Sequence, residues 1–244
     1  MNMEKPVRRA MQDWLRLRPY LYHFAPLENI RQIMDRGEML SARRIVEMAV
    51  TYQPDQVDDP DTLLATPRRS KVSLRVGPRE SDVFTLNDQR PMTLGNCFAN
   101  LDCSPEEFVR TLNSYVFFWP GDTDGPRTKG KHGASFVSRY HHFAALRFRF
   151  TDIEHGAVTL KFCGCNSGAP QERHRIRRSP AIFRPFAEPK LVGQAVEVVA
   201  EGSLQLPDVL EYRSAAQPDW ILVDRTAKQL RDIKPAVAPE GIPS

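Results

Sequence analysis

The apolar residues of this chain occur in short runs, and helical patterns separate these runs at irregular intervals. Residues 115–119 and 195–200 are examples, and both runs are far shorter than the ~20 residues that a membrane-spanning helix needs. The order of helices and strands is also too irregular for a doubly wound βαβ protein, in which the two alternate. The sequence therefore predicts an α+β fold and no association with a membrane.

Size and composition predict one folded domain. The chain has 244 residues, of which 41% are hydrophobic and 26% charged, and both values are ordinary for a globular protein. We expect a single domain over residues 1–232 and a flexible tail over 233–244, which contains three prolines. The first residues, MNMEKPVRRA, lead into no apolar signal core, so we expect a cytoplasmic location and four reduced cysteines.

Four segments have the apolar spacing and the terminal residues of helices, namely 6–18, 27–36, 41–50 and 104–112. Gly37 is a suitable C-cap for the second, Ser41 an N-cap for the third, and Ser104 an N-cap for the fourth. Apolar and alternating runs predict strands at 20–24, 71–76, 82–86, 115–119, 143–150, 158–162 and 192–200. Pro120 should end the strand over 115–119, and the Pro- and Asp-rich residues 52–70 should form a loop.

Three segments combine a β-prone run with polar side chains that could carry chemistry. They are Tyr22-His23-Phe24 before the second helix, Asn87-Asp88-Gln89-Arg90-Pro91-Met92, and Ala195-Val196-Glu197-Val198-Val199. From the residues alone, His23 is as readily a partly buried histidine, Arg90 a salt-bridged turn residue and Glu197 a solvent-facing acid. The alternation of apolar and polar residues does not show whether Glu197 faces solvent or a cleft, because both of its neighbours are valines on the opposite face of the strand.

Taken in order, these segments resemble NAD-dependent ADP-ribosyltransferases, nearest to the DarT type, which modifies nucleic-acid bases. The likeness runs through short islands between residues 20 and 205. Further matches resemble a second bacterial family that we take as a distant branch of the same fold, and they are Leu112-Asn113, Val116-Phe117-Phe118-Trp119, Asn166-Ser167-Gly168, and Arg178 with Phe183. The resemblance implies an ADP-ribosyltransferase-like domain of two small packed antiparallel or mixed sheets, with flanking helices and an NAD cleft.

The resemblance also implies roles for individual residues, with NAD as a substrate. Glu197 and Arg90 would be catalytic. The residues that would bind NAD are His23, Phe24, Tyr22, Arg43, Arg44 and Tyr115. Cleavage of the nicotinamide–ribose bond develops oxocarbenium character on the sugar, and an ionised carboxylate beside the ribose stabilises that charge. The arginine that acts on the acceptor stays open among Arg43, Arg44, Arg75 and Arg90.

The acceptor that the resemblance implies is a base in single-stranded DNA or RNA. The protein would then act as a bacterial toxin or phage-defence effector, and an antitoxin protein could be a partner. A net charge of +4 and clusters such as Arg68-Arg69 suit a phosphate-rich ligand, although they also suit a solvated surface. The alternatives are a protein or small molecule as acceptor, a non-catalytic binding module of the same fold, and transfer of a 2′-phosphate from RNA to NAD.

Cys163 and Cys165, together with His174, could suggest a metal site. Structural zinc sites use four ligands in spaced pairs, and the sequence has no second matched pair. No metal is therefore expected.

Overall fold

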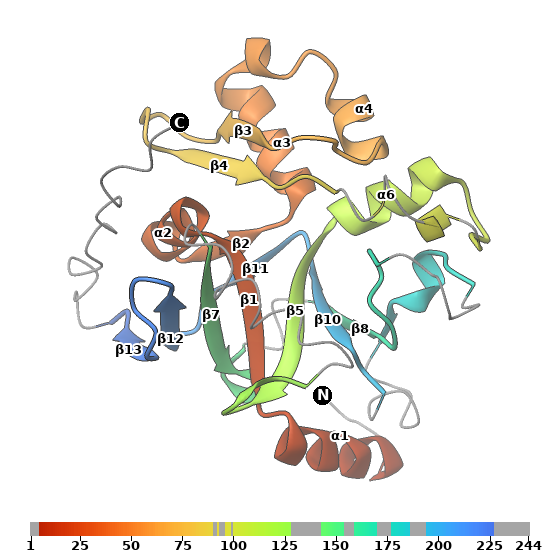
Figure 1. The fold of residues 1–244 in the computed structure, drawn as a ribbon, viewed down its shortest axis with the longest axis vertical. Coiled ribbons are helices and arrows are strands. Elements are labelled where there is room, and N and C mark those ends of the chain that lie inside the picture. The colour runs from red at the N-terminus through yellow and green to blue at the C-terminus, as the bar shows by residue number, and fades with distance from the viewer. Residues whose placement is uncertain are drawn as a thin grey trace, which may run out of the picture.

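The computed structural model describes residues 5–89, 92, 96–98, 100–127, 143–153, 159–169, 177–185 and 194–226. Helices flank a large antiparallel sheet in the middle of the molecule (Figure 1). The helices are α1 (Lys5–Leu17), α2 (Leu27–Arg36), α3 (Ala42–Tyr52), α4 (Pro60–Ala65) and α6 (Pro105–Asn113), with short 3₁₀ turns at Pro54–Gln56, Asn96–Phe98, Phe150–Asp152 and Pro180–Ile182. The α+β class that the sequence predicts is thus confirmed.

The helix ends follow local capping signals. Gly37 adopts a left-handed conformation with a φ of 74°, which glycine reaches without strain, and closes α2. The Ser41 hydroxyl accepts the N–H of Arg44 at the start of α3, and Ser104 caps α6 in the same way. The three caps predicted from the sequence are therefore confirmed.

The expectation of a loop over residues 52–70 is wrong. This stretch contains a 3₁₀ turn and the helix α4. The Asp59 carboxylate accepts the N–H and the hydroxyl of Thr62, and Pro60 occupies the first helical turn, where its missing N–H has no partner to lose. The aspartates and prolines that indicated a loop include the start signal of a helix.

Among the described residues, the central sheet has nine strands in the order β13-β12-β7-β1-β5-β10-β8-β9, and β6 pairs with β5. The strands are β1 (Tyr20–Pro26), β5 (Tyr115–Asp122), β6 (Gly125–Pro126), β7 (Phe143–Arg149), β8 (Leu160–Cys163), β9 (Arg184–Pro185), β10 (Glu197–Glu201), β12 (Val209–Ser214) and β13 (Ile221–Asp224). Two smaller pairs are β2 (Glu38–Leu40) with β11 (Ser203–Gln205), and β3 (Val72–Arg75) with β4 (Val83–Leu86). All of these pairings are antiparallel.

The strand β5 runs past the proline that was expected to end it. Leu21 pairs with Pro120 and Tyr20 with Gly121, so the strand continues to Asp122. The neighbours β1 and β6 hold this extension, and their pairing outweighs the missing N–H of the proline. The expected strand over 192–200 is seen as β10, which begins at Glu197, whereas residues 192 and 193 lie outside the described part of the chain.

The pairing of β1 with β5 is short. Three pairs join the two strands, from Tyr20 with Gly121 to Tyr22 with Trp119, whereas β1 pairs with β7 at seven positions. We call these three pairs the seam. Beyond it the two strands diverge, β1 toward α2 and β5 toward α6 (Figure 1). The two small sheets implied by the resemblance are therefore two wings of one sheet, which the seam joins: a β1 wing (β13-β12-β7-β1) and a β5 wing (β5-β10-β8-β9).

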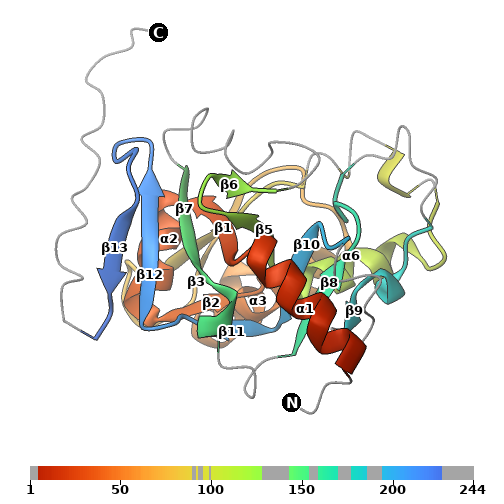
Figure 2. The ribbon, with the colours of Figure 1, turned by 90° about the horizontal axis from the view of Figure 1, so that it is seen from below.

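Two apolar cores cover the sheet. The larger core packs α1, α2 and α3 against one face, and α1 crosses the sheet on its underside (Figure 2). The smaller core packs α6 against the β5 wing, with members Phe108, Leu112, Tyr115, Cys163 and Val199. Among the described residues, no helix has the length and apolar character needed to cross a membrane. The expected tail, residues 233–244, lies outside the described residues.

Candidate functional site

Glu197 lies on the same face of the sheet as three aromatic residues. It pairs with Cys163 of β8, and two positions further along β10 Val199 pairs with Phe117. Side chains two apart on a strand share a face, so Glu197 shares the face of Phe117 and of Trp119. Trp119 pairs with Tyr22 across the seam, which places Tyr22 on this face too. We call it the Glu197 face.

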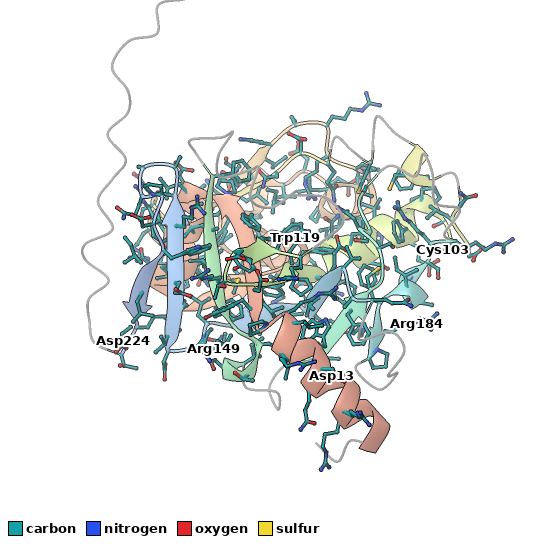
Figure 3. All side chains as sticks on the ribbon, turned by 60° about the horizontal axis from the view of Figure 1, so that its bottom comes forward. Asp13, Cys103, Trp119, Arg149, Arg184 and Asp224 are labelled. Carbon is teal, nitrogen blue, oxygen red and sulfur yellow. The ribbon has the colours of Figure 1, made fainter. Side chains whose placement is uncertain are left out.

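The Glu197 face continues across both wings. Figure 3 shows Trp119 in the middle of the molecule, between Cys103 at one end and Asp224 at the other. Glu197 and Tyr22 therefore reach the same face from strands on opposite sides of β5.

The Glu197 carboxylate is buried and held by the backbone. Only 3% of the residue is exposed, and its Oε2 accepts the N–H of Ser167 at 3.1 Å. Burial raises the pKa of Glu197 to about 7, hydrogen bonds from the side chain and the backbone N–H of Ser167 oppose the rise, and nearby Cys165 adds to it. Arg178 favours the charged form through its positive charge. A carboxyl with a pKa near neutrality is a suitable group for acid–base or electrostatic chemistry.

Two thiols and a buried arginine surround this carboxylate. The sulfur atoms of Cys163 and Cys165 are 3.4 Å apart, and both cysteines are free thiols. The hydrogen bond with Cys165 and burial raise the pKa of Cys163, whereas the bond from Cys163 lowers the pKa of Cys165 to about 7. Arg178 donates to Cys97 Sγ at 3.0 Å. In the described part of the chain, no three His, Cys, Asp or Glu side chains gather closely enough to bind a metal.

His23 projects from the other face of β1, at the end of the seam. It follows Tyr22 directly, and its ring lies 5.8 Å from that of Phe118. The His23 Nδ1 atom is 3.0 Å from the carbonyl oxygen of Phe117. A carbonyl only accepts, so this bond requires the proton on Nδ1 and leaves Nε2 as an acceptor. Burial lowers the pKa of His23, which favours this neutral form.

Tyr22 and Phe24 are in an aromatic cluster on the Glu197 face. Their rings stack with centroids 6.3 Å apart, and Phe24 meets Trp119 edge-on at 5.6 Å. The Tyr22 hydroxyl donates to the Asp122 carbonyl and accepts from Arg147. These contacts fix the position of Tyr22.

The remaining predicted site residues are more scattered. Tyr115 lies on the Glu197 face, where its hydroxyl accepts from Lys161 at 3.0 Å. Arg43 and Arg44 are exposed on α3, and both pair with Glu47 at 2.8 and 2.6 Å. Arg75 ends β3, and its N–H donates to Gln56. Arg90 lies outside the described residues.

The structure thus brings Glu197, Tyr22, Phe24 and Tyr115 to one face, while His23 and the α3 arginines lie elsewhere. A hollow of about 820 Å³ is lined by α4 and the following residues, including Arg68 and Arg69, and one of about 570 Å³ is lined in part by Arg43. Glu197 lines neither. Ser167 contacts Glu197, and Arg178 lies near it. Both residues belong to the sequence matches described above, but the sequence assigned neither of them a role.

A comparison with models of protein families assigns this chain to a family. The match is described as "Family of unknown function (DUF7002)" and covers residues 19–209, which is most of the chain. The chain belongs to this family. The DUF7002 match runs from just before β1 into β12, so His23, Arg178 and Glu197 all lie within it. A search of curated proteins finds no match.

Two solved structures are similar to this DUF7002 chain. One is Thermus sp. 2.9 DarT in complex with ADP-ribosylated ssDNA, with 10% sequence identity and a TM-score of 0.34. The other is Thermus sp. 2.9 DarT in complex with NAD+, with 12% identity and a TM-score of 0.32. Each similarity covers 79% of this chain and 80% of the DarT chain.

Proposed function

We propose that this protein is an NAD-dependent ADP-ribosyltransferase whose catalytic acid is Glu197. The observation that carries the proposal is the state of this side chain: it is buried, beside an aromatic face, and fixed by the N–H of Ser167. Unpaired glutamates are rarely buried without a chemical reason. The resemblance of the sequence around Glu197 to the catalytic strand of DarT-type enzymes supplies that reason.

In the proposed reaction, the bond between nicotinamide and ribose breaks and nicotinamide leaves. The ribose gains oxocarbenium character, which the ionised Glu197 carboxylate stabilises. Because the pKa of Glu197 is raised to about 7, nicotinamide release should increase as the pH rises through this value. The acceptor atom then bonds to the ribose carbon and loses its proton.

Other residues would hold NAD. The neutral His23 imidazole offers Nε2 as an acceptor for a ribose hydroxyl, and Tyr22 or Tyr115 would stack on nicotinamide. Phe24 would support Tyr22 through the observed ring contact. Arg43 and Arg44 would also bind NAD, and Arg90 would be catalytic, while the arginine that acts on the acceptor stays open among Arg43, Arg44, Arg75 and Arg90. These roles come from the resemblance and stay predictions.

The acceptor that we propose is a base in single-stranded DNA or RNA. A base within a duplex is stacked and paired, so its ring atoms are accessible only after unstacking, which a single strand makes easy. Exposed Arg69 beside the larger hollow provides positive charge for a phosphate backbone. We further propose that the protein is a toxin or phage-defence effector and that an antitoxin protein counteracts it.

The experiment measures nicotinamide release and transfer of label from NAD that is labelled in its ADP-ribose part. Single-stranded DNA, RNA and protein are supplied separately. Glu197→Gln should lower the rate by ~10²–10³ because it removes the charge and keeps the shape. Glu201→Gln is the matched control, because Glu201 is in the same strand but exposed and paired with Lys161. Equal rates of nicotinamide release for the wild type, Glu197→Gln and Glu201→Gln would refute the catalytic role of Glu197.

A second candidate is a non-catalytic binding module of the same fold. The observation that favours it is that His23 and Glu197 project from opposite faces of the sheet. Binding of NAD without nicotinamide release, in the presence of every acceptor pool, would support this candidate. Label that appears only in the protein pool would instead keep the enzyme and change its acceptor.

A further inference from the structure

One peptide group connects Arg178 to Glu197. Arg178 Nη2 donates to the carbonyl oxygen of Asn166 at 3.1 Å, and the N–H of Ser167 donates to Glu197 Oε2 at 3.1 Å. The carbonyl of Asn166 and the N–H of Ser167 belong to the same planar peptide. A guanidinium therefore binds one end of this peptide and a carboxylate binds the other.

This connection is shielded from water. Arg178 and Glu197 are each 3% exposed, and Ser167 is 1% exposed. In such surroundings hydrogen bonds strengthen and polarise one another. A cation on the Asn166 carbonyl makes the attached N–H a stronger donor, so it favours the negative form of Glu197.

A third segment fixes Arg178. Its Nη1 donates to Cys97 Sγ at 3.0 Å, and its backbone N–H bonds to the carbonyl of Asn100 at 2.9 Å. Its own carbonyl accepts the N–H of Asp102 at 2.8 Å. The backbone is thus held on both sides, which directs the guanidinium toward Asn166.

We infer that Arg178 is a positioning residue for Glu197, which it orients and whose ionised form it favours through the peptide between Asn166 and Ser167. Its catalytic meaning rests on the proposed function, whereas the physical link between the two side chains does not. Among the described residues, the other titratable groups near Glu197 are Cys163 on β8 and Cys165 in the turn that follows. On this face β5 presents Phe117 and Trp119, which carry no titratable group, and Tyr115, which lies opposite Glu201 at the far end of β10.

The first test leaves Arg178 unchanged and follows three NMR signals against pH. The signals are the carboxyl carbon of Glu197, the amide of Ser167 and the guanidinium of Arg178. All three should shift with one midpoint, and Glu197→Gln should abolish the shift of the other two. Cys165 titrates in the same range, so the titration is repeated in Cys165→Ser. A guanidinium signal that stays constant while that of Glu197 moves would overturn the link.

The second test removes the positive charge. Arg178→Met should raise the midpoint of Glu197 by about one pH unit, a tenfold weaker acid, and move the pH profile of nicotinamide release upward with it. Arg178→Lys keeps the positive charge, so the midpoint of Glu197 in this variant should lie close to that of the wild type. Arg177→Met is the control, because Arg177 is the adjacent residue but is exposed and pairs with Asp102. An unchanged midpoint in folded Arg178→Met would refute the inference.

The two tests separate the possible failures. If Arg178→Met does not fold, the first test, which follows the guanidinium of Arg178 itself, still decides whether Arg178 is linked to Glu197. If no protein releases nicotinamide, the proposed function fails, but the shared midpoint of the three signals still confirms or refutes the role of Arg178.

Discussion

The imidazole of His23 and the carbonyl oxygen of Phe117 meet at 3.0 Å where β1 and β5 stop pairing. A side chain thereby replaces the backbone bond that the next position of a ladder would have made. The replacement holds β1 and β5 together at the end of the seam, and it uses the neutral form of the ring.

The first prediction concerns the pH dependence of this contact. Burial lowers the pKa of His23 below its ordinary value near 6.5, so the unfolded chain binds the proton more readily. The stability that the neutral ring contributes is complete above pH ~6.5 and is lost as the pH falls. His23→Asn keeps an N–H donor but does not titrate. Urea unfolding between pH 7.5 and about pH 5 should show a smaller loss of stability in His23→Asn than in the wild type. Equal losses would contradict the prediction.

Glu197 should have the opposite pH dependence. Burial raises its pKa from 4.5 to about 7, so the folded state retains a proton that the unfolded chain has released. Stability is therefore lost as the pH rises from about 4.5 to about 7. Glu197→Gln should be more stable than the wild type by on the order of 3 kcal/mol at pH ~8 and equal to it near pH ~4, at ~1.4 kcal/mol per pKa unit. A variant less stable than the wild type at the higher pH would refute this.

Local signals explain which helices could be predicted. Gly37, Ser41 and Ser104 act within one turn of their helices, so their roles follow from neighbouring residues. Asp59-Pro60 carries the same kind of signal, but the surrounding prolines and aspartates hid it. A capping signal depends on the order of residues along the chain, here an aspartate followed by a proline at the start of the helix. The overall composition of a segment does not contain this order.

The site was less accessible to sequence reasoning than the helices. The burial of Glu197 depends on pairing between β8 and β10, whose residues are more than thirty positions apart. Ser167 and Arg178 come near Glu197 only through this pairing and through the contact of Arg178 with residues 97–102. The segment around Ser167 was part of the resemblance, but no periodicity in the sequence assigns an N–H to a distant carboxylate.

The third prediction concerns the ion pair between β7 and β12. Arg147 and Glu211 face each other in register and form two bonds of 2.7 and 2.8 Å, with the Arg147 guanidinium 4.2 Å from the ring of Trp220. Arg147→Met leaves the Glu211 carboxylate half-buried without its partner and should cost about 3 kcal/mol. Arg149→Met, in the same strand but exposed, should stay within ~0.5 kcal/mol. Chemical unfolding measures both, and equal effects would contradict the prediction.

The fourth prediction concerns Gly37. Alanine in the left-handed conformation costs ~1–2 kcal/mol, and a Cβ at this position would also collide with the Arg225 guanidinium. Gly37→Ala should therefore lose about 2 kcal/mol in thermal unfolding. Gly168→Ala, where a Cβ would meet open space, is the control and should change stability little. A neutral Gly37→Ala would show that the helix end rearranges.

The fifth prediction compares two partly exposed thiols. The hydrogen bond from Cys163 and the charge of Arg178 bring the pKa of Cys165 to about 7, whereas partial burial and then Glu107 raise the pKa of Cys103. Because the thiolate is the nucleophile, iodoacetamide at pH ~7 should alkylate Cys165 roughly tenfold faster than Cys103. Cys163→Ala should reduce this difference. Mass spectrometry of timed samples measures both rates, and faster modification of Cys103 would refute the prediction.

The seam gives the sheet a line of low mechanical resistance. Only three backbone residue pairs and the bond between His23 and Phe117 join β1 to β5 among the described residues, whereas seven residue pairs bind β1 to β7. Small rotations of one wing against the other therefore concentrate at Tyr22 and Trp119. A compound that binds across β1 and β5 would restrict this motion. The backbone amide hydrogens on either side of the seam would then exchange with water more slowly.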